Sequence, residues 1–207
     1  MRLTSPNFNE GDRIPAAHAF AVPDPDEHIR YSDNRNPELR WEDVPDGTEA
    51  FALLVIDPDV PSVGDDVNQE GRTVPADLPR TEFSHWVVVD IPADMRQLEE
   101  GQYSDGGVVP GGKPGRSNGL REGVNDYTGW FEGDPEMEGV YKGYDGMCPP
   151  WNDTVVHHYR FTLYALDTAS ISVASDFTAD EVKQAIQGHI LAEATLTGTY
   201  SLNPDVT

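Results

Sequence analysis

The chain has 207 residues, and no linker-like stretch divides it, so residues 1–207 are expected to form a single domain with a sizeable core. Its 37 acidic residues outnumber the 14 basic ones and give a formal net charge of −23. Such a surface repels phosphate-rich polymers and anionic headgroups, which excludes a nucleic-acid partner and stable membrane association. The acids are scattered rather than blocked, as in proteins used at high salt, where the Debye length falls to about 3 Å. We therefore expect a halophilic source.

The cysteine count and the lengths of the apolar runs indicate the cellular compartment. Cys148 is the only cysteine, so neither an intrachain disulfide nor a thiolate zinc cluster can form. Residues 1–6 lack an apolar signal segment, and the longest plain apolar run, residues 51–56, is far shorter than a membrane span. These features predict a soluble, cytoplasmic protein.

The first half of the chain predicts short strands and loops. Short edge strands are expected in the proline-rich residues 1–40, and residues 38–41 alternate like a strand. Residues 51–56 form a continuous apolar run, typical of a strand buried on both faces, and Asp57-Pro58 is expected to end it in a rigid turn. Residues 62–80 are polar and irregular and predict a long loop.

The next expected strand covers residues 83–91. A period of two places His85 on the face shared by Phe83, Val87, Val89 and Ile91. The glycine-rich residues 101–150 predict a folded loop region laid over a sheet, because their aromatic residues, Trp130 among them, need burial.

The last third of the chain alternates again over residues 157–166. His157 and Tyr159 share one face, and His158 points to the other. Thr178 and Glu181 form a capping box that begins a helix, expected to end near residue 193, and residues 197–201 predict a final strand. The chain is therefore mainly β, and an antiparallel β-sandwich with one or two peripheral helices and long loops is the expected fold class.

Two stiff segments and two strand histidines suggest a small-anion site. The segment Asp57-Pro58-Asp59-Val60-Pro61 holds a carboxylate on a proline-locked backbone. Imidazole titrates near the second ionisation of a phosphate monoester, so His85 and His157, with the phenol of Tyr159, are suitable donors for a phosphate or carboxylate. A plain turn and satisfied core histidines are the alternative interpretation of each feature taken singly.

A second stiff loop reads Gly146-Met147-Cys148-Pro149-Pro150. Glycine permits a close approach of the backbone to a ligand, and the prolines hold the loop open. Cys148 is expected to be a small packed thiol rather than a reactive one.

Together these segments resemble the phosphatidylethanolamine-binding protein family, in particular its prokaryotic, Raf-kinase-inhibitor-like branch. The matching stretches include FSHWVVVDIP at residues 83–92, the Asp-Pro-Asp-x-Pro motif, and Cys-Pro-Pro followed by His157-His158-Tyr159. They cover most of residues 8–201 in family order. Met147 stands where the family usually has proline, and we expect it to narrow the pocket mouth.

The resemblance implies an antiparallel Greek-key β-sandwich with a small pocket at one end that binds anions such as phosphate, phosphorylethanolamine or acetate. Its pocket positions fall on Asp57, His85, His157 and Tyr159. Asp59 falls beside the pocket, and Gly146 and Pro149 fall on the rim loop. By analogy with relatives, a kinase or protease is a possible protein partner.

Three functions remain open from the sequence. The first is a non-enzymatic anion-binding protein with no cofactor. The second is a metal-dependent or acid–base hydrolase that uses Asp57, His85 and His157. The third is a protein-interaction scaffold with a vestigial pocket. A homodimer is compatible with each.

Overall fold

The computed structural model describes residues 1–115 and 119–206, and β-strands dominate it. The described strands are β1 (Arg2–Thr4), β2 (Ala21–Asp24), β3 (His28–Tyr31), β4 (Leu39–Glu42), β5 (Ala50–Pro61), β6 (Arg80–Pro92), β7 (Gln97–Leu98), β8 (Gly112–Pro114), β9 (Arg121–Glu122), β10 (Val140–Lys142), β11 (His157–Leu166) and β12 (Ile190–Tyr200). The helices are a 3-10 turn (Ala16–His18), α1 (Tyr127–Trp130) and α2 (Ala179–Ala185). The mainly β prediction is confirmed.

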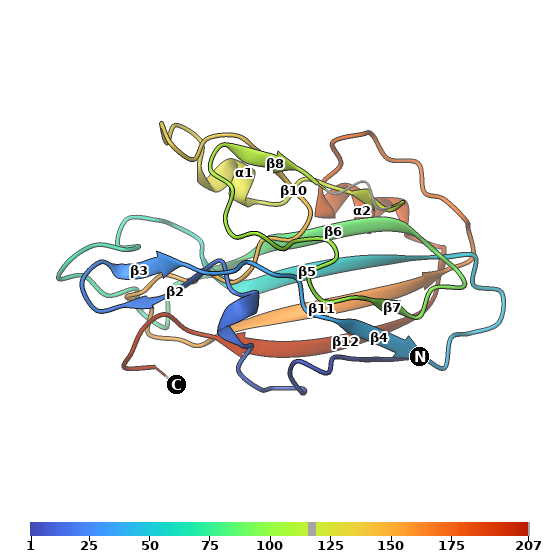
Figure 1. Cartoon of the computed structure of the whole chain (residues 1–207), viewed down its shortest axis with the longest axis horizontal. Helices are drawn as coiled ribbons and strands as arrows, with labels where there is room; N and C mark the ends of the chain where they lie inside the picture. The colour runs from blue at the N-terminus through green and yellow to red at the C-terminus, as the bar shows by residue number, and fades with distance from the viewer. Residues whose placement is uncertain (116–118, 207) are drawn as a thin grey trace.

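The main sheet has the order β12-β11-β5-β6-β9, and all of its neighbouring strands are antiparallel. A smaller sheet, β1-β4-β7, covers one face, and α2 lies on the other side (Figure 1). The rings of Trp41 in β4 and Phe51 in β5 meet edge to face at 5.5 Å between the two sheets. One described two-stranded pair outside the main sheet, β8 with β10, is parallel.

Strand β5 is buried on both faces, as its unbroken apolar sequence predicted. Phe51, Leu53 and Val55 pack into the core between the sheets, which we call the first core. Leu54 and Ile56 pack into a second core beneath α2, together with Val182 and Phe177 of the C-terminal part. Because successive side chains of a strand point to opposite faces, one strand serves both cores.

Strand β5 does not end at Asp57, so the predicted turn is wrong. The strand continues to Pro61, and its pairing with β6 is irregular between Asp57 and Val60. Pro58 has no N–H to donate, so the regular ladder breaks there and the irregularity absorbs the mismatch. As a result, Asp57 lies within a strand and its side chain is buried.

A second irregularity lies in β6 at His85. Ser84 pairs with Ile56 and Trp86 pairs with Val55, which leaves His85 as the extra residue between them. The bulge reverses the alternation, so Trp86 and Val88 join the first core while Val87 joins the second. The predicted common face of His85 with Val87 and Val89 is therefore wrong.

The capping box at the start of α2 is confirmed. The Glu181 carboxylate accepts from the Thr178 N–H at 2.8 Å, and the Glu181 N–H donates to the Thr178 hydroxyl at 3.4 Å. The helix ends at Ala185 rather than near residue 193. Gly188 has φ +84°, which reverses the chain so that residues 190–200 pair along β11. The pairing of β12 with β11 therefore outweighs the helical spacing of the apolar residues that continues past Ala185.

Residues 101–150 pack over the sheet as predicted, although one aromatic expectation fails. Tyr103, Tyr141 and Tyr144 are buried in the first core, whereas Trp130 is 50% exposed.

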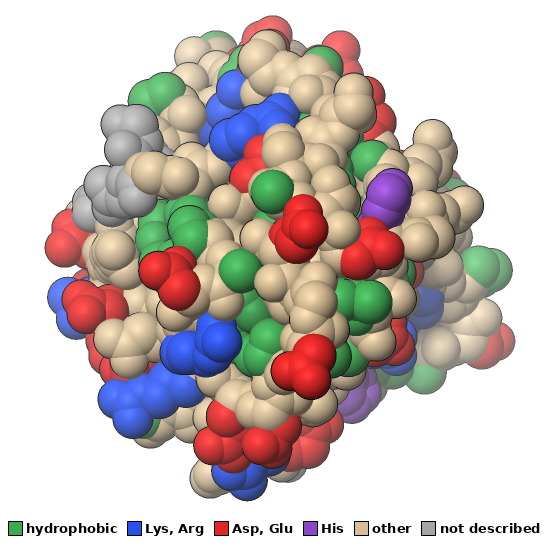
Figure 2. Space-filling view, turned by 90° about the vertical axis from the view of Figure 1, so that its right-hand side faces the viewer, with side chains coloured by type: hydrophobic (Ala, Val, Ile, Leu, Met, Phe, Trp, Pro, Cys, Tyr) green, Lys and Arg blue, Asp and Glu red, His purple; other side chains and the backbone are tan. Residues whose placement is uncertain are grey.

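Figure 2 shows acidic side chains in separate groups with Lys and Arg between them at one end of the molecule. None of the described helices is long and apolar enough to cross a bilayer.

Candidate binding site

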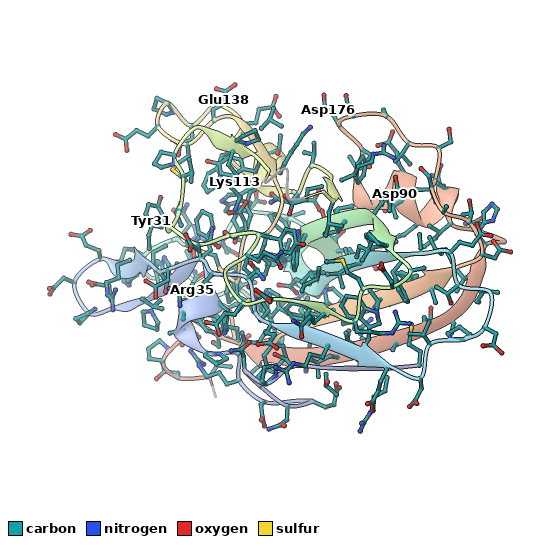
Figure 3. The ribbon with its side chains drawn as sticks, turned by 45° about the vertical axis from the view of Figure 1, so that its right-hand side comes forward. Tyr31, Arg35, Asp90, Lys113, Glu138 and Asp176 are labelled. Atoms are coloured by element: carbon teal, nitrogen blue, oxygen red, sulfur yellow. The ribbon has the colours of Figure 1, made fainter. Side chains whose placement is uncertain are left out.

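A cavity of about 190 Å³ opens at the end of the main sheet that carries the first residues of β6. Tyr31, which lines this cavity, and Asp90, near the other end of β6, lie on opposite sides of the molecule in Figure 3. The walls of the cavity are largely apolar. They include Phe20, Val60, Pro61, Val63, Val67, Phe83, Tyr127, Trp130, Phe131, Cys148, Pro149 and Pro150.

The structure brings together five of the seven residues expected at the pocket. Asp57, His85, His157, Tyr159 and Pro149 all line the cavity. The first four come from three adjacent strands of the main sheet, β5, β6 and β11. The bulges in β5 and β6 fall beside Asp57 and at His85, so the same irregularities that break the ladder aim these side chains at the cavity.

Asp59 and Gly146 do not line the cavity. The Asp59 carboxylate accepts hydrogen bonds from the backbone N–H and the ring Nδ1 of His158, both at 2.8 Å. Gly146 instead supports the site from behind. A Cβ there would lie 2.0 Å from the carbonyl oxygen of His18, so the position requires glycine.

His157 is fully buried and bonds to a carboxylate through each ring nitrogen. Its Nδ1 donates to Asp57 at 2.7 Å and its Nε2 donates to Asp153 at 3.0 Å. Burial lowers the pKa of His157, but these two carboxylates outweigh burial and raise the pKa to about 9. His157 is therefore an imidazolium at neutral pH. With both N–H groups in use, it does not have the free donor that the sequence suggested.

Asp153 is the site residue that the sequence reasoning missed. It is 1% exposed, and the Arg80 guanidinium donates to both of its oxygens, at 2.5 and 3.1 Å. Burial raises the pKa of Asp153, but the hydrogen bonds from His157 and Arg80 outweigh this and lower the pKa overall. Only its position four residues before His157 hinted at contact. The resulting chain, Arg80–Asp153–His157–Asp57, alternates in sign and is neutral overall.

His85 is held in one tautomer by the loop behind it. Its Nδ1 lies 2.9 Å from the carbonyl oxygen of Asp145 and 3.1 Å from that of Gly146. Carbonyl oxygens only accept, so Nδ1 carries the hydrogen. Burial lowers the pKa of His85, and the opposing charge of Asp57 offsets this only in part. His85 is therefore neutral at neutral pH, and its Nε2 lone pair remains free.

Tyr159 supplies the hydroxyl of the site. It is fully buried, and its oxygen makes no well-formed hydrogen bond to any described protein group, although the Asp57 carboxylate lies near enough for a weak one. Its ring lies 5.1 Å from the ring of His85 in an edge-to-face arrangement. Burial, followed by the charge of Asp57, raises the pKa of Tyr159 well above its usual value, so the hydroxyl keeps its proton.

The loop at residues 146–150 contributes apolar wall. Burial raises the pKa of the Cys148 thiol to about 12, so the sulfur is a packed, neutral thiol. Met147 is buried in the first core, and its carbonyl oxygen accepts from Phe20. It does not narrow the mouth, because its side chain does not line the cavity. That expectation from the sequence is wrong.

The hydrolase alternative required a metal centre or a free acid–base pair. Among the described residues, no group of three or more His, Cys, Asp or Glu side chains is arranged to hold a metal ion. The His157 nitrogens that such a centre would need are bonded to Asp57 and Asp153.

Comparison with known proteins identifies the class. A family model described as phosphatidylethanolamine-binding protein matches residues 4–201. The UPF0098 protein YbhB of Escherichia coli is 31% identical over 97% of this chain and 100% of its own length. A UPF0098 protein of Methanothermobacter thermautotrophicus is 32% identical over 97% of this chain and 98% of its own length.

Solved structures agree with these sequence matches. The crystal structure of Escherichia coli YbcL, described as a new member of the mammalian PEBP family, superposes with a TM-score of 0.67 at 27% identity over 97% of each chain. A putative PEBP homologue of Chlamydia trachomatis gives a TM-score of 0.63 at 26% identity, over 97% of this chain and 96% of its own. The chain belongs to the phosphatidylethanolamine-binding protein family, and its relatives include the prokaryotic members named YbhB and YbcL.

Proposed function

We propose that this chain is a non-enzymatic binding protein that holds one small phosphorylated or carboxylated ligand in the cavity between β5, β6 and β11. The Tyr159 hydroxyl carries the proposal, because it is fully buried, lines the cavity and makes no well-formed hydrogen bond. Leaving a buried hydroxyl unpaired costs about 1–3 kcal/mol, and a ligand oxygen would remove that cost. The description of the matching family, phosphatidylethanolamine-binding protein, supports a phosphorylated ligand.

The protonation states of Cys148 and His157 favour binding over turnover. Cys148 is a neutral thiol, and a thiol is a far weaker nucleophile than a thiolate. His157 holds its protons between two carboxylates and has no free nitrogen to accept a proton from a substrate. The cavity therefore offers hydrogen bonds and shape to a ligand but no activated nucleophile among the residues described above.

Charge balance sets the expected strength of binding. The Arg80–Asp153–His157–Asp57 chain is neutral, and none of the Lys and Arg side chains in the described part of the chain lines the cavity. Selection would rest on shape and on single hydrogen bonds, each worth about 0.5–1.5 kcal/mol. We infer modest affinity for any one small acid.

Calorimetric titration with phosphorylethanolamine, inorganic phosphate and acetate tests the proposal. Tyr159→Phe removes one hydrogen bond and should weaken binding about 2- to 10-fold. The same variant should fold at least as stably without ligand, because it deletes an unpaired buried hydroxyl. Tyr164→Phe is the matched control, since Tyr164 lies on the same strand but packs against the second core. Equal affinity in wild type and Tyr159→Phe would contradict the proposal.

The inhibition of a kinase or protease, which the resemblance implies by analogy, stays a prediction. A pull-down with the His85→Ala variant separates the scaffold alternative. A scaffold would keep its protein partner when the cavity is altered, whereas a ligand-dependent regulator would lose it.

A further inference from the structure

The free nitrogen of His85 determines what kind of ligand the cavity accepts. Its Nδ1 hydrogen is committed to the carbonyl oxygens of Asp145 and Gly146, at 2.9 and 3.1 Å. A neutral imidazole has one donor and one acceptor nitrogen, so Nε2 presents a lone pair. An oxyanion brought against this atom would meet electron density instead of a hydrogen.

The other buried polar side chains at the deep end of the cavity, Asp57, His157 and Tyr159, do not make up for this missing donor. Both N–H groups of His157 point at carboxylates. Asp57 is an acceptor, with its oxygens already facing His157 and the N–H of Asp59. Tyr159 has the one uncommitted hydroxyl among these side chains. The polar end of the cavity thus holds more acceptors than free donors.

We propose that the cavity binds its acid ligand together with one proton, which is shared between His85 Nε2 and a ligand oxygen. This inference rests on the proposed function and narrows its ligand class. The ligand is a weak acid that still carries a proton near neutral pH, such as an organic phosphate monoester. Fully ionised sulfate esters or sulfonates of the same shape are disfavoured.

The surroundings of His85 keep that proton off the ring until a ligand arrives. The groups that face it are Asp57 on β5, Asp126 before α1, Tyr127 on α1, Asp145 behind it and Tyr159 on β11. Asp57 exerts the largest charge effect on the ring, and its charge is already balanced by His157. The Asp145 carboxylate is balanced by the Lys113 ammonium, 3.0 Å away. Because these charges are balanced, burial dominates and leaves His85 Nε2 unprotonated in the ligand-free protein.

The outer part of the cavity indicates the substituent on the acid. Asp57, His85, His157 and Tyr159 are buried, whereas Tyr31, Val63 and Trp130 are about half exposed. All of these residues line the same cavity, so its polar end is deep and its apolar end is at the mouth. An acid group with an apolar or aromatic substituent matches this gradient. Phenyl phosphate and phenyl sulfate are suitable probes because they differ mainly in the acidic proton.

Calorimetric titration of the wild-type protein with the two probes, in buffers that differ in enthalpy of ionisation, measures the number of protons taken up on binding. Phenyl phosphate has a second pKa of about 6, so at about pH 8 it is a dianion. We expect uptake of about one proton per bound molecule there. Its affinity should fall about tenfold per pH unit above that pKa. Phenyl sulfate cannot bring a proton and should bind more weakly than phenyl phosphate at about pH 6.

A histidine-to-glutamine pair provides matched controls. His85→Gln should abolish most of the proton uptake, because an amide donates without ionising. His189→Gln should leave the uptake unchanged, because His189 is 47% exposed and pairs with Asp167 away from the cavity. Nitrogen chemical shifts of His85 in the wild type give a readout that needs no variant. Nε2 should move from an unprotonated to a protonated or hydrogen-bonded position when phenyl phosphate binds.

Two results would overturn the inference, and they differ from one another. If both probes bind with equal, pH-independent affinity and without proton uptake, the proton-sharing site is refuted while the anion-binding function stands. If neither probe, phosphorylethanolamine nor phosphate binds at any pH, the proposed function fails and this inference fails with it.

Discussion

The buried His157 imidazolium should make the stability of the protein fall at alkaline pH. Its pKa is about 9 in the folded protein, against 6.5 when unperturbed. A raised histidine pKa stabilises the fold fully below about pH 6.5, and this contribution is lost as the pH rises through about 9. Each pKa unit corresponds to about 1.4 kcal/mol, so the protonated state contributes about 3 kcal/mol to the free energy of unfolding.

Chemical denaturation of wild type and His157→Gln, at high salt and at several pH values, isolates this contribution. At about pH 6 the variant should be about 3–5 kcal/mol less stable, because removing the imidazolium leaves the buried Asp57 carboxylate without its charged partner and leaves Asp153 with Arg80 alone. The difference should shrink by about 3 kcal/mol towards pH 10 as the wild-type ring loses its proton. Tyrosines and Cys148 titrate alike in both proteins and cancel. Parallel curves, with a constant difference, would refute a buried imidazolium between Asp57 and Asp153.

Three further predictions concern other parts of the structure. Asp153→Asn should lower the pKa of His157 and destabilise the fold by about 3–5 kcal/mol, measured by NMR titration and denaturation; an unchanged pKa would contradict the pairing. Gly146→Ala should lower the free energy of unfolding by at least about 1–3 kcal/mol, because its Cβ would clash with the His18 carbonyl oxygen. Equal melting temperatures of variant and wild type would disprove that contact. Raising salt from about 0.1 M to molar concentration should stabilise the chain, since its net charge of −23 repels itself less; a fall in stability would contradict a salt-adapted surface.

The sequence was informative wherever alternation continued without interruption. The alternation at residues 157–166 placed His157 and Tyr159 on the buried face and His158 on the exposed one, and the structure shows this arrangement. The capping box at Thr178 likewise predicted the start of α2, because both of its hydrogen bonds are local. Local patterns of this kind need no knowledge of the rest of the fold.

The predictions failed where distant strands decide the geometry. The bulge at His85 arises from pairing between β5 and β6, so the period of β6 alone could not reveal it. The same pairing carries β5 through Pro58 to Pro61. Strand β12 begins as early as Ile190 because it pairs with β11, which shortens α2. In each case a long-range partner outweighs the local preference.

The sequence named four of the polar residues that line this cavity but did not indicate their protonation. Asp57, His85, His157 and Tyr159 line one cavity. Their hydrogen-bond partners, however, include Asp153 and two backbone carbonyl oxygens, which no sequence pattern marks. Because of those partners, both N–H groups of His157 are already bonded, and His85 offers an acceptor nitrogen to a ligand. The sequence had suggested that both histidines are donors.

Histidine NMR in the presence and absence of phosphorylethanolamine, at high salt and about pH 7, tests the central claim most directly. The account predicts that His85 responds to the ligand at Nε2, that His157 remains doubly protonated in both states, and that exposed His158 and His189 do not respond. A spectrum in which His85 does not change at saturating ligand would contradict a small-acid site in this cavity.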